Sequence, residues 1–284
     1  MNNLDNRFCI VTPNLNMGSY LAETIESVLS NLEEGDAYFV IDGGSKDGSI
    51  EIIKSYEDRI SGWISEPDGG YAEAVDKGFA MAESKFQYWL ACGDLMLPGA
   101  LSLARSILTQ TKADMIFGDD FYIDVDGHVL QLTNGYAPNL SAMMLSGDWT
   151  PLQDACFWRS SLYRRVGGLN IDFRYAADYD LFLRMALCGR CEYTPHVFSA
   201  FRSHDGQTSQ KHRGAYRDEK FAAKTAVARS HDLPRILVLT RFFYWFYARF
   251  RARIWSAKTL APQFLGSAVR DHVAGLCKGF GGGE

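Results

Sequence analysis

The sequence has no long apolar run and no apolar leader. No uninterrupted apolar stretch approaches the roughly 20 residues that a bilayer-spanning helix needs. The N-terminal residues Met1–Asp5 are polar and lack an apolar segment of secretory length. We therefore expect a cytoplasmic protein with neither a signal peptide nor a membrane-spanning helix.

Cysteine is sparse and shows no metal-binding spacing. The six cysteines are scattered along the chain, and a single CxxC occurs at Cys188 and Cys191. A zinc site would require a second pair or a paired histidine motif, and the context of a redox pair is missing too. Free thiols in a reducing compartment are the favoured interpretation.

Basic residues are scarce in the first two thirds of the chain. Residues 1–201 hold 14 Lys and Arg against 28 Asp and Glu, whereas residues 202–258 hold 13 against 4. An acidic body suits metal or polyhydroxyl chemistry, and a basic segment suits an anionic partner or surface. Nucleic-acid binding is not expected, because the body is acidic and the basic segment is rich in apolar residues.

The first 120 residues alternate short apolar runs with amphipathic stretches. Such alternation predicts βαβ units and a mainly parallel sheet. Ligands of these sheets bind beyond the carboxyl ends of the strands. The expected strands are Phe8–Thr12, Tyr38–Ile41, Trp63–Ile64, Phe86–Leu90 and Met115–Phe117.

The pattern changes after residue 120. A hairpin with an Asp126-Gly127 turn is expected over residues 122–131, and a long surface loop over residues 133–150. A helix over Asp178–Leu187 and a strand over residues 192–201 follow. Two more helices are expected from Arg213 onward.

Polar clusters follow four of the expected strands. Each alone is a common turn sequence, but four of them at successive strand ends are unlikely by chance. They are Thr12-Pro-Asn14, Asp42-Gly-Gly-Ser45, Glu66-Pro-Asp-Gly-Gly70 and Cys92-Gly-Asp94.

These clusters, together with Leu97–Leu101 and Asp178–Arg184, resemble glycosyltransferase family 2 over roughly residues 8 to 210. The resemblance implies the α/β GT-A fold, an open mainly parallel sheet flanked by helices. It divides the chain into a nucleotide-sugar half (1–120), an acceptor half (121–212) and a basic helical C-terminal extension (213–284).

The resemblance implies a role for each cluster in binding the donor. Thr12 and Asn14 would line the nucleobase and ribose pocket, and Asp42 would accept hydrogen bonds from base or ribose. Asp68 would lie further along the same cleft. The turn Ala91-Cys92-Gly93-Asp94 would face the diphosphate and hold Mg²⁺ or Mn²⁺, since hard oxygen ligands suit these ions.

The sequence departs from the family at this turn. Gly93 stands where relatives commonly have a carboxylate, so we expect an ion that arrives with the diphosphate rather than a prebuilt cage. Asp94 could instead be a cap or turn residue before Pro98. His204 either completes the metal shell or is an ordinary loop histidine.

Asp178 is the expected general base, because it matches the aspartate that begins the acceptor-side helix in this family. The usual glutamate before it is Ala177 here. Asp180 would point to another side of the helix and pair with Arg184 at i,i+4 spacing. One base and one direct displacement imply inversion at the anomeric carbon.

Gln153 and Trp158 are expected to flank the acceptor pocket, although Trp158 is equally well explained as a core residue. Gln207 lies with His204 in a segment that closes over the donor in many relatives. The aromatic and Arg-rich stretch 235–258 either contacts a membrane surface or packs on a protein.

The sequence therefore predicts an inverting hexosyl- or N-acetylhexosaminyltransferase that uses a nucleotide-sugar, with UDP-sugars favoured. The acceptor would be a glycan or a lipid-linked sugar in bacterial exopolysaccharide, capsule or lipopolysaccharide synthesis. A nucleotidyltransferase is disfavoured, because Thr12–Asn16 carries no basic residue. A non-enzymatic scaffold that binds nucleotide-sugar or membrane is the other alternative, favoured by Gly93 and Ala177.

Overall fold

A computed structural model describes residues 6–137, 140–141, 144, 149–204 and 211–230 of the chain. Its elements are β1 (Phe8–Asn14), α1 (Gly18–Leu29), β2 (Ala37–Asp42), α2 (Ser49–Ser55), β3 (Gly62–Ser65), α3 (Tyr71–Ala80), β4 (Phe86–Trp89), β5 (Leu95–Met96), α4 (Ala100–Gln110), β6 (Met115–Ile123), β7 (Val129–Thr133), η1 (Gln153–Ala155), β8 (Cys156–Arg159), α6 (Ser160–Val166), α7 (Ala177–Cys188), β9 (Cys191–Arg202) and α9 (Arg213–Ser230).

One sheet runs through the molecule in the order β3-β2-β1-β4-β8-β6-β9-β5, with β7 paired to β6. The strands β3, β2, β1 and β4 are parallel neighbours, as expected. Beyond β4 the sheet is mixed, because β8 pairs antiparallel with both β4 and β6. β6 and β9 pair parallel again, and β7 and β5 add antiparallel pairs to β6 and β9.

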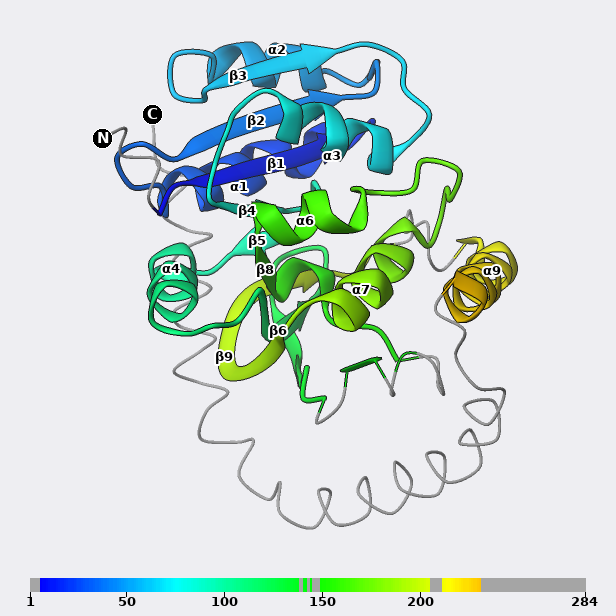
Figure 1. Cartoon of the computed structure of the whole chain (residues 1–284). Coiled ribbons are helices and arrows are strands. Elements are labelled where there is room, and N and C mark those ends of the chain that lie inside the picture. Colours follow the sequence, from blue (N-terminus) through cyan, green and yellow to red (C-terminus); the bar gives the residue numbers. More distant parts are fainter. Residues whose placement is uncertain (1–5, 138–139, 142–143, 145–148, 205–210, 231–284) are drawn as a thin grey trace.

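Two apolar layers lie on the two faces of this sheet. Along β1, Phe8 and Ile10 face one layer, and Cys9 and Val11 face the other. Strands buried on both faces read as continuous apolar runs, which explains the run at Phe8–Val11. Helices α1, α2 and α4 contribute to the first layer, and α3, α6, α7 and α9 to the second (Figure 1).

Helix α3 packs so closely on β1 that only glycine fits at the contact. A Cβ atom added at Gly78 would lie 2.6 Å from both γ-carbons of Val11. Real Cβ atoms do not approach so closely, so a side chain here would push the helix away from the strand. Gly78 thereby allows α3 to pack directly on β1.

The described residues contain no helix that is both long and apolar enough to cross a bilayer. The expected hairpin is confirmed, with Gly127 at φ 83° in the turn between β6 and β7. The first of the two helices expected from Arg213 is α9. The second, like the segment 235–258, lies outside the described residues.

Candidate active site

The loop after β2 is organised around the carboxylate of Asp42. Its Oδ1 accepts a hydrogen bond from Asn14 Nδ2 at 2.7 Å, since the two residues are paired in register across β1 and β2. Its Oδ2 accepts hydrogen bonds from the backbone N–H groups of Gly44 and Ser45 and from the hydroxyl of Ser65. The ends of β1, β2 and β3 are thus tied to one carboxylate.

These hydrogen bonds decide the charge of Asp42. Burial acts to raise its pKa, but the hydrogen bonds from Ser45, Ser65 and Asn14 outweigh burial and hold the pKa below its ordinary value. A carboxylate has about four acceptor sites, and protein donors occupy them here. Asp42 is ionised at neutral pH and shapes the loop on which it lies.

Asp68 lies against the same loop. A Cβ atom added at Gly43 would be 3.1 Å from Asp68 Oδ2, so the loops after β2 and β3 touch. Asp68 Oδ1 accepts a hydrogen bond from the N–H of Gly70 at 2.9 Å. Burial raises the pKa of Asp68, although this N–H acts in the opposite direction. Asn14, Asp42 and Asp68 therefore belong to one edge of the sheet.

The turn at Cys92–Asp94 is fixed by helix α1. The Thr24 hydroxyl accepts a hydrogen bond from the Gly93 N–H at 3.0 Å and donates one to the Asp94 carbonyl at 2.9 Å. Cys92 Sγ lies 3.5 Å from the carbonyl oxygen of Met17. Gly93 has φ 109°, a conformation that disfavours any residue with a side chain. The glycine is therefore required by the backbone of this turn.

Asp94 points into the protein, toward the end of β9. Its side chain is 5% exposed, and its Oδ1 accepts a hydrogen bond from the N–H of Arg202 at 2.9 Å. Burial and the nearby Asp154 carboxyl raise the pKa of Asp94, and the Arg202 N–H and charge oppose them. The turn is anchored to β9 through this carboxyl group.

The Arg202 side chain holds the same turn from its other side. This fully buried guanidinium donates hydrogen bonds to the Gly93 carbonyl at 2.8 Å and the Val125 carbonyl at 2.8 Å, and pairs with Glu23 at 2.5 Å. It also lies over the ring of Tyr20, 5.0 Å from the centroid. Arg202 thus joins the turn at Cys92–Asp94, helix α1 and the β6–β7 hairpin.

Two further carboxyl groups are buried near Asp94. Asp120 on β6 is 3% exposed and Asp154 in η1 is 2% exposed. Asp120 Oδ1 and Asp154 Oδ2 have no hydrogen-bond partner among the described residues. Burial is the main cause that raises the pKa of both groups, and the charge of Asp154 adds to the effect on Asp120. The turn at Cys92–Asp94 therefore lies close to three buried carboxyl groups.

The geometry around Asp94 fits an ion only as one ligand among others. Its Oδ1 already accepts a hydrogen bond, and Gly93 supplies no second carboxylate. Among the described residues, the one group of three possible ligands within 4.8 Å of each other is Asp124, Asp126 and His128. An ion at Asp94 would depend on diphosphate oxygens and water for its remaining ligands.

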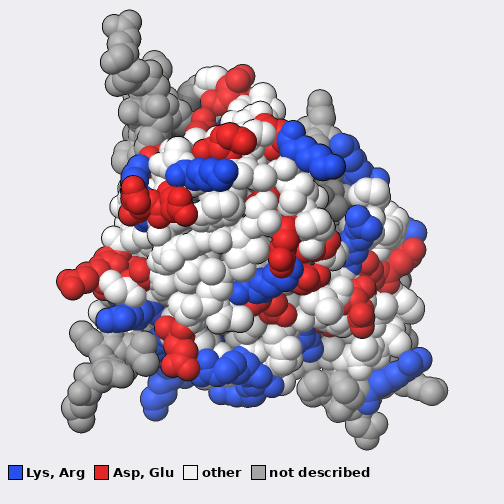
Figure 2. Space-filling model, turned by 90° about the horizontal axis from the view of Figure 1, so that it is seen from above, with Lys and Arg blue, Asp and Glu red and all other residues white. Residues whose placement is uncertain are grey.

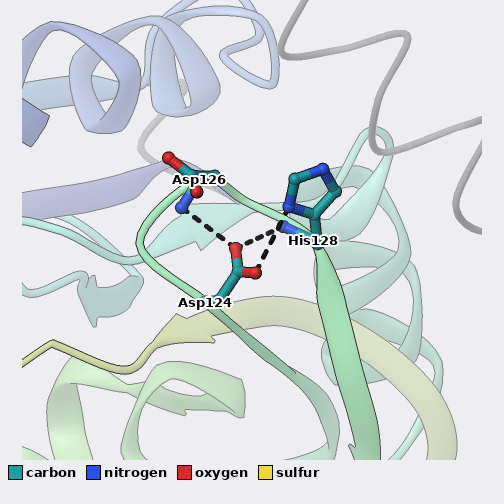
Figure 3. Close-up of side chains that lie close together, drawn as sticks. All are labelled: Asp124, Asp126 and His128. Carbon is teal, nitrogen blue, oxygen red and sulfur yellow. Dashed lines mark hydrogen bonds and ion pairs between the residues drawn. The ribbon is translucent and has the colours of Figure 1, made fainter.

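The group formed by Asp124, Asp126 and His128 is a hairpin turn (Figure 3). The Asp124 carboxylate accepts hydrogen bonds from the backbone N–H groups of Asp126 and His128, at 2.9 and 2.8 Å. Asp126 and His128 are exposed. The local hydrogen bonds account for this arrangement without an ion.

The expected base, Asp178, lies at the start of α7 and touches α3. Its backbone N–H donates to the Tyr71 hydroxyl at 2.9 Å, and that hydroxyl lies 3.3 Å from Asp178 Oδ1. Burial raises the pKa of Asp178, opposed by the Tyr179 N–H, the charge of Lys220 and the Tyr71 hydroxyl. Because Tyr71 directly follows the loop of Asp68, Asp178 lies next to the loop after β3.

The structural role expected for Asp180 is confirmed. Arg184 donates from Nε and Nη2 to Asp180 Oδ2, at 2.9 and 2.6 Å. The same guanidinium reaches the Gly168 carbonyl at 2.9 Å. Asp180 therefore holds α7 against the segment after α6 and does not share the surroundings of Asp178.

Two predicted site residues belong to the interior. Thr12 is fully buried, and its hydroxyl lies 2.9 Å from that of Tyr38, while its place in the nucleobase pocket stays a prediction. Trp158 is fully buried beside Trp89, with ring centroids 5.1 Å apart, and is a core residue, the second of its two interpretations. Sequence patterns cannot tell which face of a doubly covered strand meets a ligand.

Gln153 and His204 lie closer to the site. Gln153 is half-buried and donates to the Trp89 carbonyl at 2.9 Å, just before the turn at Cys92–Asp94. His204 is half-buried beside Tyr20, with ring centroids 5.9 Å apart. Its part in metal binding stays a prediction. Gln207 lies outside the described residues.

Four residues around the site are not predicted by the sequence patterns. Tyr71, Arg202, Asp120 and Asp154 contact or surround predicted residues from distant parts of the chain. The sequence indicates two of them only by proximity to predicted site residues, since Tyr71 follows the Asp68 loop and Arg202 precedes His204. Their partners are set by the sheet order, which the local pattern does not reveal.

The family model described as Glycosyl transferase family 2 matches residues 9–165, which is more than half of the chain. This match includes the loops after β1, β2 and β3 and the turn at Cys92–Asp94. The chain belongs to glycosyl transferase family 2. The expected family and the α/β GT-A fold are thereby confirmed.

Relatives in sequence and structure agree with this family. An uncharacterised glycosyltransferase of Mycobacterium tuberculosis is 29% identical over 198 residues, covering 65% of this chain and 73% of that protein. The glycosyltransferase GlyG of Streptococcus pneumoniae is 25% identical over 123 residues, 42% of this chain and 41% of GlyG.

Two solved structures share the fold at low identity. Staphylococcus aureus TarS, residues 1–349 in complex with UDP, has a TM-score of 0.57 at 15% identity and matches 69% of this chain. This chain spans 60% of that TarS structure. The mannosyltransferase PcManGT of Pyrobaculum calidifontis, in complex with GDP-Man and Mn²⁺, has a TM-score of 0.56 at 13% identity and covers 96% of this chain and 86% of that chain.

Proposed function

We propose that this chain is an inverting glycosyltransferase that takes a sugar from a nucleotide-diphosphate-sugar and transfers it to a glycan or lipid-linked acceptor. The observation that supports this most is the contact between Asp178 and Tyr71, which brings a carboxyl base beside the donor-side loops. UDP-sugars are the favoured donors, since the TarS structures hold UDP and UDP-GlcNAc. The transferred group would be a hexose or an N-acetylhexosamine.

In this proposal Asp178 accepts the proton of the acceptor hydroxyl. The hydroxyl oxygen forms its bond to the anomeric carbon as the bond to the diphosphate breaks, so the configuration inverts. A carboxyl group with a raised pKa is a stronger base than an ordinary aspartate. Tyr71 holds the carboxyl group in place through its contacts with both the side chain and the backbone of Asp178.

A divalent ion, Mg²⁺ or Mn²⁺, would neutralise the charge that develops on the departing diphosphate. Asp94 would be its protein ligand, with His204 as the second candidate. The Mn²⁺ in the PcManGT structure supports use of such an ion. The buried position of Asp94 favours an ion that is held mainly by the donor.

The acceptor would belong to a bacterial cell-surface polysaccharide, and the protein would act in the cytoplasm at the inner face of the membrane. The basis for membrane contact is the aromatic, Arg-rich sequence of residues 235–258. Sedimentation of the whole chain with anionic lipid vesicles tests this contact. Equal recovery in the supernatant with and without vesicles would contradict it.

A calorimetric titration with UDP in the presence of Mn²⁺ tests the donor site. We expect saturable binding that weakens when Mn²⁺ is removed, because the ion would link the diphosphate to Asp94. Absence of binding by UDP, GDP and the other nucleoside diphosphates would contradict the proposed function.

A catalytically degenerate scaffold that binds nucleotide-sugar is the second candidate. It is favoured by Gly93, Ala177 and the inward position of Asp94. Such a protein would bind the nucleotide yet turn over no sugar donor. Turnover therefore separates the two candidates.

A further inference from the structure

Helix α9 packs against the helix that carries the base. Figure 1 shows α9, in yellow to orange, beside α7. Ala223 and Val227 of α9 are buried in the same apolar layer as Tyr179, Phe182 and Leu183 of α7. The described part of residues 213–284, which the sequence assigned to an extension, shares this apolar layer.

One carboxylate of α9 holds the segment that leads into α7. Glu219 accepts hydrogen bonds from three consecutive backbone N–H groups, with lengths of 3.1 Å from Arg174, 2.7 Å from Tyr175 and 2.8 Å from Ala176. Helix α7 begins at the next residue, and Asp178 is its second residue. The bonds therefore fix the backbone that directly precedes the base.

No side chain caps the start of α7 from its own N-cap position. Its N-cap residue is Ala176, which has no side chain able to accept a hydrogen bond from the first turn. Glu219, on another helix, accepts from the three N–H groups just before α7, and the Tyr71 hydroxyl accepts from the N–H of Asp178 in the first turn. A carboxylate near a helix N-terminus also interacts favourably with the helix dipole.

The neighbouring Lys220 reinforces this contact. Although it is a lysine, Lys220 is 4% exposed. Its Nζ lies 3.3 Å from the Thr150 hydroxyl and 4.5 Å from the centroid of the Tyr179 ring. Tyr179 is the residue after Asp178. Two successive residues of α9, Glu219 and Lys220, therefore contact the start of α7.

From this geometry we infer that Glu219 is a positioning residue for the Asp178 base, and that α9 is part of the catalytic apparatus. The inference rests on the proposed function, since it needs Asp178 to act as a base. Without Glu219 three N–H groups lose their acceptor, and the turn before Asp178 can shift. A misplacement of about 1 Å in an active site can cost about 100-fold in rate.

The test compares Glu219→Ala and Glu219→Gln with the control Asp218→Asn. Asp218 is exposed and lies one residue away on the same helix. In the full chain, well below the melting temperature of every variant, we expect Glu219→Ala to lower kcat at least about tenfold. The Kd for UDP should stay within about twofold, since Glu219 is not a donor ligand. Glu219→Gln should be intermediate because its amide oxygen can still accept, and Asp218→Asn should behave as the wild type.

Amide hydrogen exchange tests whether Glu219 orders residues 174–176, and it does so without a measurement of turnover. We expect faster exchange at residues 174–176 in Glu219→Ala and unchanged exchange there in Asp218→Asn. Unchanged exchange in Glu219→Ala, or a kcat within about twofold of the wild type, would overturn the inference. A parallel loss of kcat and UDP affinity would also overturn it, by indicating general damage to the fold.

Failure of the proposed function and failure of the role inferred for Glu219 give different results. If the wild type binds UDP but transfers no sugar, the proposed function fails and the role of Asp178 fails with it. Faster exchange at residues 174–176 in Glu219→Ala would then still establish the contact as the device that orders the start of α7.

Discussion

At the scale of single residues, the aspartates of this site differ in how many donors surround them. Asp42 accepts hydrogen bonds from four protein donors, and its pKa lies below the ordinary value. Asp94, Asp120 and Asp154 are equally buried but have few donors, and burial raises their pKa. The same residue type is therefore a fixed charge after β2, whereas burial beneath the turn at Cys92–Asp94 favours its protonated form.

The role of Asp178 can be tested with an isosteric change. Asp178→Asn should lower kcat at least about 100-fold, because general-base catalysis contributes about 10²–10⁴-fold. Affinity for UDP, measured by calorimetry, should change little. Asp172→Asn, an exposed aspartate before α7, is the matched control. Equal losses of turnover and UDP affinity in Asp178→Asn would remove Asp178 from the base role.

The pH dependence of kcat/KM reports the same group. A base must be deprotonated, so kcat/KM should fall as the pH falls through the pKa of Asp178. Burial raises that pKa, so the loss should occur at higher pH than an ordinary aspartate would give. A profile that stays flat down to the ordinary range of aspartate would contradict this environment.

Asp120→Asn should stabilise the protein at neutral and basic pH. With a raised pKa in the folded state, Asp120 keeps a proton that the unfolded chain releases, so stability falls as the pH rises from the ordinary to the raised value. Each pKa unit corresponds to about 1.4 kcal/mol. Urea unfolding at pH 5 and pH 8 should show a smaller decline in the variant. An equal decline would mean that Asp120 does not carry this cost.

At the scale of elements, the sequence predicts most of what local patterns control. The strands β1 to β4, the helices between them and the hairpin turn at Gly127 follow from apolar runs, periodicity and glycine. The order of β8, β6 and β9 does not follow, because their pairing depends on contacts between distant segments. Tyr71 meets Asp178 across 107 residues of sequence for the same reason.

The contact between α3 and β1 gives a prediction at this scale. Gly78→Ala would place a carbon against both γ-carbons of Val11, so α3 must move, with an expected cost of about 1–3 kcal/mol in the free energy of unfolding. Gly214→Ala in α9 is the control, since nothing lies within 4 Å of an added carbon there. The control should be neutral or slightly stabilising in urea unfolding. Equal stability of the two variants would show that the α3–β1 contact is loose.

At the scale of the whole molecule, the acidic body and the basic segment of the sequence divide the charge unevenly. On the face seen in Figure 2, acidic and basic side chains are interspersed among uncharged ones. The excess of carboxylates thus does not form one uniform negative field on this face. Some of these carboxyl groups, such as Asp120 and Asp154, are buried near the turn at Cys92–Asp94. The most basic stretch lies outside the described residues.

The central claim is that this assembly of loops, turn and base transfers sugar. Incubation with a panel of nucleotide-sugars, with UDP-sugars first, tests it most directly through the release of nucleoside diphosphate. We expect release from at least one donor in the presence of Mn²⁺ or Mg²⁺, and its loss with a chelator and in Asp178→Asn. Binding of a nucleoside diphosphate without turnover of any nucleotide-sugar or transfer to any acceptor would contradict the account and indicate a scaffold.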